Sequence, residues 1–404
     1  MSGFDDKEER ILQLLSRKGR LTKQEIAQGC DFSRSTVTNV LSRLSRLSLL
    51  ETADGSSRGG RRPGLVGLRD SVAHAVGIDI GTHFIRTVVT DVSGTVLASD
   101  VQEREPYNYE TLEPPDIAGA TARVLEKCSL DRSDIDAYGI GISGIVDERT
   151  GVCLFLNKVA EWRDFPVRDH YAEVFGTDHV YVRDSTNTMA AAEKRFGACK
   201  YDPDFVVVNI GMGMGASIYI DDTSITSKGR ISGEIGHIDI AQSASMCCCG
   251  NTGCLESTSS GWAIASRVKG ALDTGVVSSL SSFASTYLIR MKDIIDAALS
   301  GDKLAVSMLR DSAKQTAIGM SILINLLNPP KIILVGGIVR GAGDLFVQAL
   351  KRETQDHVLP WLRQDVHFTM GTLGEFDGAI GSAAVAIEES LTDILARKVS
   401  TASA

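Results

Sequence analysis

The sequence lacks several features that would point to a membrane or secreted protein. No run of about 18 uncharged apolar residues occurs, so a membrane-spanning helix is not expected. The chain begins with the acidic stretch Met1-Ser2-Gly3-Phe4-Asp5-Asp6, where a signal peptide would be basic and then apolar. Aromatic residues make up only 6%, prolines number nine, and charged residues reach 23%, which is typical of ordinary folded proteins. We therefore predict a cytoplasmic protein with no membrane partner.

Length and charge indicate more than one module. At roughly 150 residues per domain, the 404 residues predict two to three domains. The formal charge of −9 is unevenly spread, because residues 1–70 contain 13 Lys and Arg against 9 Asp and Glu. This part carries +4 and leaves −13 for the rest. Such asymmetry is expected when one module meets the phosphates of a nucleic acid and the other does not.

Residues 1–70 have the pattern of a winged helix-turn-helix. An apolar stripe from Ile11 to Leu15 predicts a first helix. A second helix begins at Thr22, with Glu25 at the spacing of a capping box, and a third begins with Ser33 as its N-cap. Two short strands then flank a Gly-rich and Arg-rich tip, which we interpret as the wing.

The third helix and the wing supply the predicted DNA contacts. Exposed polar side chains on the helix can donate to phosphates and base edges in a major groove, and arginines at the wing suit the minor groove or the backbone. The predicted contacts are Arg34, Ser35, Thr36, Thr38, Asn39 and Arg43 of the helix, and Arg58, Arg61 and Arg62 of the wing. The alternative is a three-helix protein-interaction module with a flexible linker, which the +4 balance disfavours.

One recognition helix reads too few base pairs for specificity. We therefore expect a homodimer or homotetramer on a palindromic operator of double-stranded DNA, with the two heads on successive half-sites.

From His74 onward the pattern changes to strands, and it repeats. Asp79-Ile80-Gly81 and Asn209-Ile210-Gly211 stand 130 residues apart, each at the end of a buried strand and before an antiparallel one. A third turn, Gly336-Gly337, also follows a buried strand. Glycines at such turns let the backbone approach a phosphate, because a side chain there would collide with it.

These patterns predict three parts of the chain. Residues 1–70 form the DNA-binding head, 71–188 a first α/β lobe, and 189–404 a second α/β lobe. We expect a last helix, at about 378–397, to return to the first lobe.

Half of the eight cysteines crowd into one short segment. Cys247, Cys248, Cys249 and Cys254 closely follow His237. Three thiolates and an imidazole are ligands that Zn²⁺ prefers, and four ligands close a tetrahedral structural site. We predict that His237, Cys247, Cys249 and Cys254 bind structural zinc, while Cys248 points away. The alternatives are a redox site or unligated buried thiols.

The paired lobes, the Glu-Ile-Gly-His segment at 234–237 and the Cys-x-Cys-Gly-x-x-Gly-Cys-x-Glu cluster closely resemble the ROK family of repressors, open reading frames and kinases, over residues 75 to about 390. The resemblance implies a two-lobed actin-like ATPase and hexokinase fold of the RNase H-like type. It also implies a sugar between the lobes and a zinc ion that organises the sugar-binding loop. The winged helix places the chain among the family's transcriptional regulators.

The family's sugar contacts are carried over residue by residue. They fall on Asn157, Glu234, His237 and Glu256, and we predict that Asp184 serves as a further hydrogen-bond acceptor for the sugar. Carboxylates and a side-chain amide can chelate adjacent sugar hydroxyls, and a missing hydroxyl would leave them unpaired. The alternative for Glu234 and Glu256 is that they are ordinary surface carboxylates.

Departures from the family's kinases indicate that catalysis is lost. Ser185 occupies the position of the kinases' catalytic Asp, and a hydroxyl does not accept a proton near neutral pH, although a shift by one residue would bring Asp184 there. The first phosphate loop has Thr82 and His83 in place of Gly and Thr, and Met212 replaces a Thr in the second. We predict that the protein binds ATP poorly and is not an enzyme.

The sequence thus predicts a sugar-responsive DNA-binding regulator, a repressor of carbohydrate-metabolism genes that a sugar releases by closing the lobes. The main alternative is an ATP-dependent sugar kinase with an accessory DNA-binding head. An activator, or a regulator gated by a partner protein, is a third interpretation.

Overall fold

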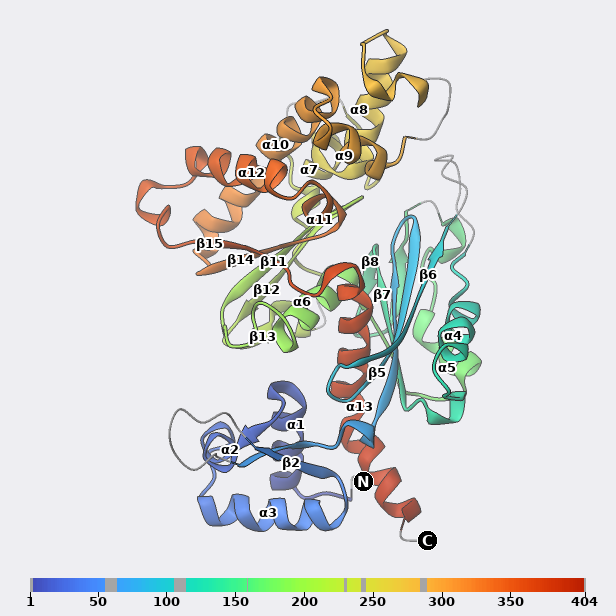
Figure 1. Cartoon of the computed structure of the whole chain (residues 1–404), viewed down its shortest axis with the longest axis vertical. Helices are drawn as coiled ribbons and strands as arrows, with labels where there is room; N and C mark the ends of the chain where they lie inside the picture. The colour runs from blue at the N-terminus through green and yellow to red at the C-terminus, as the bar shows by residue number, and fades with distance from the viewer. Residues whose placement is uncertain are drawn as a thin grey trace.

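The computed structural model describes residues 3–54, 64–104, 114–157, 159–228, 231–240, 245–283 and 289–402. The chain forms a small N-terminal head at one end of an elongated molecule and two α/β lobes beyond it (Figure 1). Both ends of the chain lie beside the head. Within the described residues, none of the helices combines the length and apolar composition needed to cross a bilayer.

The head is a winged helix-turn-helix. Its elements are α1 (Asp6–Lys18), β1 (Leu21–Thr22), α2 (Lys23–Cys30), α3 (Arg34–Arg46), β2 (Leu50–Asp54) and β3 (Gly64–Leu68). Thr22 and Glu25 form the predicted capping box of α2, and the Ser33 hydroxyl accepts from the Thr36 amide at 3.1 Å to cap α3. The strands pair in the order β1-β3-β2. Arg58, Arg61 and Arg62 of the predicted wing lie outside the described residues.

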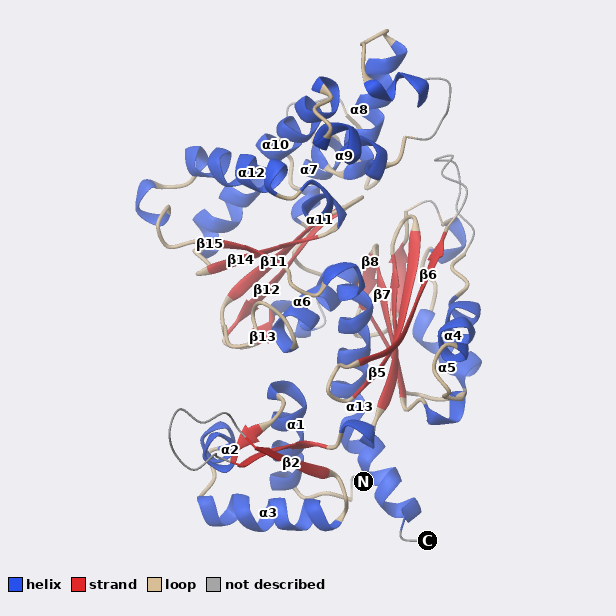
Figure 2. Cartoon of the chain, in the orientation of Figure 1, coloured by secondary structure: helices blue, strands red, loops and turns tan. Residues whose placement is uncertain are grey.

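Lobe I is built on a five-stranded sheet with the order β10-β7-β4-β5-β6. Its strands are β4 (His74–Ile80), β5 (Phe84–Asp91), β6 (Val96–Glu103), β7 (Ala137–Ile142) and β10 (Val180–Asp184), with a hairpin of β8 (Ile145–Asp147) and β9 (Val152–Phe155). β4, β5 and β6 are antiparallel neighbours, whereas β7 and β10 run parallel to β4. Helices α4 (Ile117–Glu126) and α5 (Val167–Phe175) cover one face (Figure 2).

Lobe II repeats this arrangement. Its strands are β11 (Phe205–Ile210), β12 (Met214–Ile220), β13 (Thr223–Ser224), β14 (Lys331–Val335) and β15 (His367–Met370), and their order is β13-β12-β11-β14-β15. Counted from the opposite edge, this is the order of lobe I: the first strand lies in the centre, its two antiparallel followers on one side and the two parallel strands on the other. Because the two sheets share this order, the two-lobed fold rests on a duplicated sheet.

The helices of lobe II lie in the connections from β13 to β14 and from β14 to β15. They are α7 (Leu255–Ser259), α8 (Gly261–Asp273), α9 (Met291–Leu299), α10 (Lys303–Leu327), α11 (Gly337–Ala342) and α12 (Asp344–His357). Their apolar residues pack with one face of β11 and β14 in the core of this lobe.

Two helices lie between the lobes: α6 (Ser185–Arg195) and α13 (Asp377–Ala402) (Figure 1). The expected boundary between residues 188 and 189 therefore falls inside α6. α13 lies against β4 and β7 because these strands present glycine to it. A Cβ on Gly77 would lie 2.0 Å from the carbonyl oxygen of Ala379, and one on Gly139 would lie 1.9 Å from that of Ser382. Alternate residues of both strands pack on α4 and α5 instead.

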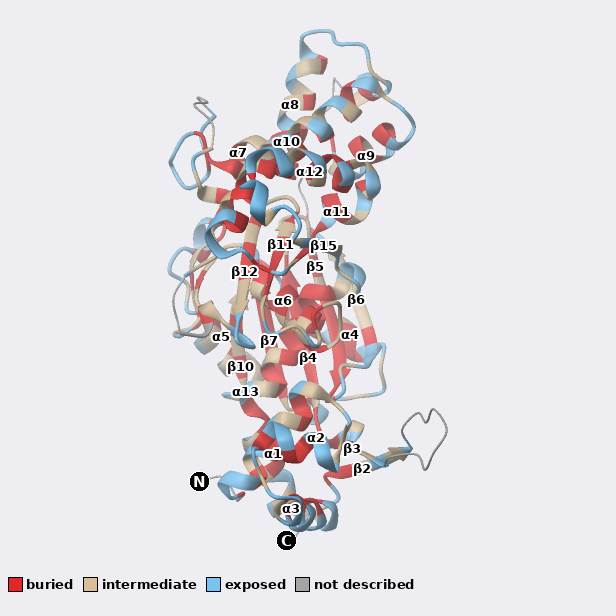
Figure 3. Cartoon of the chain, turned by 90° about the vertical axis from the view of Figure 1, so that its left-hand side faces the viewer, coloured by how far each residue is buried: buried red, intermediate tan, exposed pale blue. Residues whose placement is uncertain are grey.

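The head shares a hydrophobic core with α13. Ile11, Leu12 and Leu15 of α1 belong to the same buried cluster as Ile387 and Leu391 of α13. Buried positions therefore continue from the sheet of lobe I into the head (Figure 3). As a result, the DNA-binding module is docked on the body.

Candidate functional site

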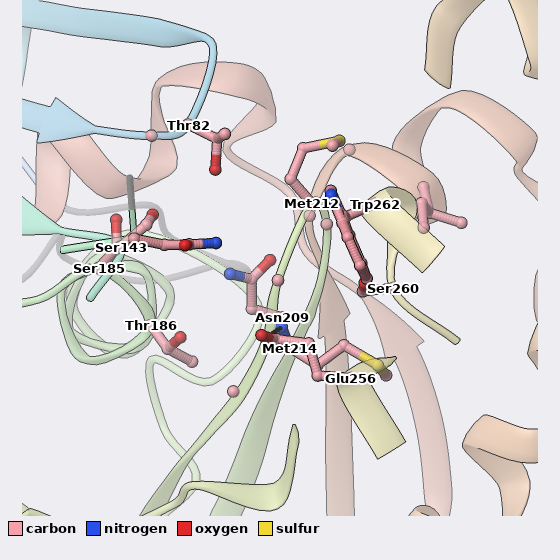
Figure 4. Close-up of a pocket in the computed structure, with 18 of the residues that line it drawn as sticks. Thr82, Ser143, Ser185, Thr186, Asn209, Met212, Met214, Glu256, Ser260 and Trp262 are labelled. Atoms are coloured by element: carbon pink, nitrogen blue, oxygen red, sulfur yellow. Dashed lines mark hydrogen bonds between the residues drawn. The ribbon is translucent and has the colours of Figure 1, made fainter. Parts of the chain in front are cut away.

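A cavity of about 860 Å³ lies between the two lobes. Such a volume is typical of pockets for small ligands. It is lined by the ends of central strands, the N-terminus of α6 and the cysteine segment, and Figure 4 shows Ser143 and Ser185 facing Asn209 and Glu256 across it. The residues predicted as sugar contacts all line this cavity: Asn157, Asp184, Glu234, His237 and Glu256. The fold thus gathers in one place side chains that span a hundred positions of the chain.

Asp184 stands where β10 ends and α6 begins. Its carboxylate caps α6, because Oδ1 accepts from the backbone amides of Thr186 at 2.7 Å and Asn187 at 3.3 Å. Burial, with Glu234 and Glu148 nearby, raises the pKa of Asp184 to about 7. Near neutral pH this group is therefore partly protonated, so it can either donate to or accept from a ligand hydroxyl.

Glu148 supports Asp184 from outside the lining of the cavity, and sequence reasoning missed it. Its Oε1 accepts from the Asp184 amide at 3.0 Å and from Nδ2 of Asn187 at 2.8 Å. Burial raises the pKa of Glu148 as well. The signal was its place directly after Asp147, which ends the Gly-x-x-Gly-x-Val-Asp stretch.

Ser185 is the first residue of α6 and is buried, with 1% of its surface exposed. Its hydroxyl donates to the carboxylate of Asp79, which comes near the end of β4. Burial raises the pKa of Asp79. At the position predicted to match the kinases' base, the chain therefore has a hydroxyl already committed to a neighbouring carboxylate.

Glu256 joins the second glycine turn to the cysteine segment. Its Oε2 accepts from the Met214 amide at 2.8 Å, and its Oε1 lies 3.6 Å from the thiol sulfur of Cys248. On the same lobe, Oε2 of Glu234 lies 3.9 Å from Nε2 of His237, and burial raises the pKa of Glu234. The carboxylates of Glu234 and Glu256 thus belong to the cleft and are not ordinary surface groups.

His237, Cys247, Cys249 and Cys254 form a cluster that could hold a metal ion, with their ligand atoms all within 4.8 Å of one another. Nδ1 of His237 lies 3.5 Å from Sγ of Cys247, and the sulfurs of Cys249 and Cys254 lie 3.7 Å apart. In a tetrahedral site with Zn–S bonds of about 2.3 Å, two sulfurs lie about 3.8 Å apart. The donor set and its spacing therefore fit zinc, while Cys248 lies outside these four and faces Glu256.

The part of the cleft near the glycine turns contains Met212, which the sequence analysis placed in the second phosphate loop, and further residues that were not anticipated. Met212 and the unanticipated Trp262 present large side chains there (Figure 4). Arg340, at the opening of α11, also lines the cavity, and its Nη1 donates to Oδ2 of Asp377 at 3.0 Å. No local motif marks Trp262 and Arg340, because they come to line one cavity only when the helices of lobe II pack. This end is more apolar and more cationic than the end with the carboxylates.

On the outer side of the head, α3 presents a polar surface. Its exposed residues include Arg34, Ser35, Thr38 and Asn39. Thr36 is only partly exposed, because its hydroxyl lies 2.9 Å from that of Ser33 at the helix cap. Arg46 in the last turn is exposed too, although it was not singled out.

Arg43 has a different environment from the other predicted DNA contacts. Its Nε lies 2.9 Å from Oε1 of Glu8, a buried carboxylate of α1, and its Nη1 lies 3.6 Å from Asp5. This guanidinium is therefore engaged within the head, where it neutralises a buried charge.

The sequence profile of the ROK family matches residues 75–389, and that of a winged helix-turn-helix DNA-binding domain matches residues 4–50. The fold and the cleft define a two-lobed protein of the sugar kinase type with a DNA-binding head. Because the profile spans most of the chain, the protein belongs to the ROK family.

Known proteins of two kinds are similar to the chain. The xylose repressor of Caldicellulosiruptor bescii is 27% identical over 342 residues, which cover 84% of this chain and 85% of that protein. The transcriptional dual regulator NagC of Escherichia coli is 26% identical over 386 residues, covering 95% and 93%. A ROK-family glucokinase from Streptomyces griseus, solved with glucose and AMPPNP, superposes with a TM-score of 0.66 at 26% identity and covers 78% of this chain and 99% of that one.

A solved ROK-family transcriptional regulator, a homologue of the E. coli MLC protein, superposes with a TM-score of 0.76 at 24% identity. It covers 97% of this chain and 98% of that one. The fold, head included, is thus that of the family's regulators, whereas the glucokinase spans only the two lobes.

Proposed function

We propose that the protein is a sugar-responsive transcriptional repressor. The single observation that carries this proposal is the convergence of Asn157, Asp184, Glu234, His237 and Glu256 on one interlobe cavity in a chain whose winged helix is docked on the same body. Carboxylates, an imidazole and an amide can bind the hydroxyls of a sugar in such a cavity. Relatives that match 94% and 95% of this chain are named xylose repressor and N-acetylglucosamine repressor.

The DNA contacts come from α3 and the wing. In the proposed complex Arg34, Ser35 and Asn39 face the major groove, and Arg61 and Arg62 lie along the minor groove or the backbone. The protein acts as a homodimer or homotetramer on a palindromic operator in the cytoplasm. It controls genes of carbohydrate metabolism, for which xylose and N-acetylglucosamine are the first effectors to test, since relatives carry these names.

The metal at the cysteine cluster is zinc, and its role is structural. His237, Cys247, Cys249 and Cys254 would hold the ion; Nδ1 of His237 faces Sγ of Cys247, and its Nε2 lies 3.9 Å from Oε2 of Glu234. These four ligands would join the 234–237 segment to the 247–254 segment. This holds Glu234 and Glu256 at one end of the sugar site, as outer groups commonly orient metal ligands.

The experiment that tests the proposed function is selection of genomic DNA fragments by the purified protein, with and without D-xylose, N-acetylglucosamine and D-glucose. We expect a palindromic fragment to be enriched and one sugar to release it. Enrichment that no sugar changes would overturn the sugar response, and failure to enrich any fragment would overturn DNA binding.

A sugar kinase is the second candidate, and one observation favours it. The carboxyl of Asp184 lines the cleft and has its pKa raised to about 7, where a general base is effective. Against this, one of its oxygens caps α6 and Ser185 occupies the family's catalytic position. ADP release in the presence of ATP and a panel of sugars distinguishes the candidates: a repressor gives none, and a kinase gives activity that Asp184→Asn abolishes.

A further inference from the structure

The end of α1 contacts three different parts of the body through three consecutive residues. The Ser16 hydroxyl accepts from Nη2 of Arg195 on α6 at 3.2 Å. Arg17 pairs with Glu388 of α13 at 2.7 Å, and Lys18 pairs with Asp222 of lobe II at 3.4 Å. This single helical turn therefore touches both interlobe helices and the second lobe.

Arg195 is the fixed member of this group. It is buried, and besides Ser16 it donates to the carbonyl oxygens of Val92 in lobe I at 2.8 Å and Ala384 in α13 at 3.1 Å. A buried guanidinium that lost these acceptors would be strongly penalised, so Arg195 ties α1 to lobe I and α13. The same helix α6 begins in the ligand cleft at Ser185, about 16 Å away along its axis.

Asp222 is the residue through which lobe II contacts the head. It lies on the turn between β12 and β13 with a φ of 63°, and it binds Lys194 of α6 as well as Lys18 of the head. The carboxylate is about half exposed, and so this ion pair contributes little to stability. Its position, however, depends on where the sheet of lobe II stands relative to α6.

The head has room to shift beside these contacts. A cavity of about 1130 Å³ lies between the head and the two lobes, lined by Gln13 of α1, Gly29 of α2, Tyr181 of lobe I and Tyr219 of lobe II. On this side α1 is held at its end and is not packed along its length. The docked head is therefore supported by α13 and Arg195, with open space toward lobe II.

We propose that the head reads the relative position of the two lobes through the Ser16–Lys18 turn. Arg195 is the pivot, and Asp222 is the positioning residue that carries the movement of lobe II to Lys18. Closure of the lobes on a sugar shifts Asp222 relative to Arg195, and this shift changes the orientation of α1. Because α1 and α3 belong to the same head, the distance between the α3 helices of two protein copies then changes as well. The inference rests on the proposed function and names how its cleft regulates the head.

The test measures, in the full-length protein, how strongly sugar binding changes operator affinity. Operator affinity is determined by fluorescence anisotropy with a fragment selected by the wild-type protein, with and without whichever of D-xylose, N-acetylglucosamine and D-glucose releases it. Asp222→Asn is compared with Asp221→Asn. The control removes the same charge from the neighbouring residue, which also has a positive φ, of 52°. Asn tolerates this backbone conformation at both positions.

For Asp222→Asn we expect the sugar-induced change in operator affinity to shrink by about two- to fivefold, the size that one partly exposed ion pair supports. Sugar affinity without DNA should stay within error of the wild-type value, and Asp221→Asn should respond like the wild type. Lys18→Met should reduce the response as well, and the double variant no further than Asp222→Asn alone, because Lys18→Met removes one of the two ion pairs that Asp222→Asn removes.

The contrary outcomes are distinct. A wild-type protein whose operator affinity no sugar changes contradicts the proposed function and, with it, this inference. A wild-type response that Asp222→Asn retains in full overturns the inference alone. Effects of Lys18→Met and Asp222→Asn that simply add also overturn it, since they would act through separate contacts.

Discussion

The two lobes have the same sheet but are held together by different means. In lobe I, glycines of β4 and β7 allow α13 to lie directly on the strands, and the described part of the connection between β6 and β7 contains α4 and a short 3-10 helix at Arg132–Asp134. In lobe II, a segment of about a hundred residues separates β13 from β14 and contains the cluster of His237 and the cysteines. The comparison shows that one sheet order supports two different surroundings: in lobe I the sheet carries α13, and in lobe II it carries an insertion with the candidate metal cluster.

The largest effect should come from removing the metal cluster of lobe II. Cys254→Ser takes away a fully buried ligand, and structural zinc sites contribute on the order of 10 kcal/mol to local folding. We expect metal content to fall well below one ion per chain, with faster hydrogen exchange in residues 231–260 and little change in lobe I. Cys128→Ser, in lobe I and away from the cluster, is the control. Full metal content in Cys254→Ser would refute the ligand assignment.

Lobe I should be most sensitive where α13 meets the sheet. Gly139→Ala places a Cβ against the carbonyl oxygen and carbon of Ser382. Because these are backbone atoms, α13 itself must move away. We expect a loss of about 3 kcal/mol in the free energy of unfolding, measured by urea denaturation, since overpacking a core costs about 1–3 kcal/mol or more. Wild-type stability would show that α13 is not seated on β7 at this point.

The free energy of unfolding should depend on pH through Asp184, in the cleft between the lobes. The folded-state pKa of Asp184 is raised to about 7, above its ordinary 3.8, so the folded chain binds this proton more tightly than the unfolded chain does. Stability from this group is therefore present below about pH 4 and is lost as the pH rises toward 7. Asp184→Asn, which preserves a helix cap, should raise the stability at pH 8 by about 1–2 kcal/mol and change little at pH 4.

A thermal melt of both proteins at the two pH values measures this difference. A gain of equal size at pH 4 and pH 8 would contradict the buried, protonated state of Asp184. A sugar that binds this carboxyl should also reduce the gain, because it offers the carboxylate a partner.

The smallest expected effect on stability comes from a glycine in the insertion of lobe II. Gly270 lies inside α8, on the insertion of lobe II, and is exposed, and a Cβ there would meet no other atom within 4 Å. Gly270→Ala should therefore stabilise the protein by about 0.5–1 kcal/mol, because alanine loses less backbone entropy in a helix. The same substitution at Gly139 and Gly270 thus has opposite signs, which urea denaturation of both variants can check.

Much of this architecture could be predicted from the sequence because its signals are local. The caps at Thr22 and Ser33 follow from short-range hydrogen bonding, and the head's apolar stripe follows from helical periodicity. The repeated strand and glycine turn indicated two lobes, and the spacing of the cysteines indicated a metal cluster, which the structure assembles with His237. Asp184 and Glu256 were found by resemblance, since no local pattern marks a cleft carboxylate.

The tertiary structure alone decided what each of these groups does. Arg43, a predicted DNA contact, is also paired by the fold with the buried Glu8, and Arg195 had no sequence signal although it joins α6, α13, lobe I and the head. The pKa of Asp184 likewise depends on burial and on Glu234, fifty positions away. The sequence by itself determined the elements, the duplication and the ligand types, because these depend on neighbours in the chain. Contacts between distant segments set the charge states and the link from cleft to head, because they arise only when those segments pack.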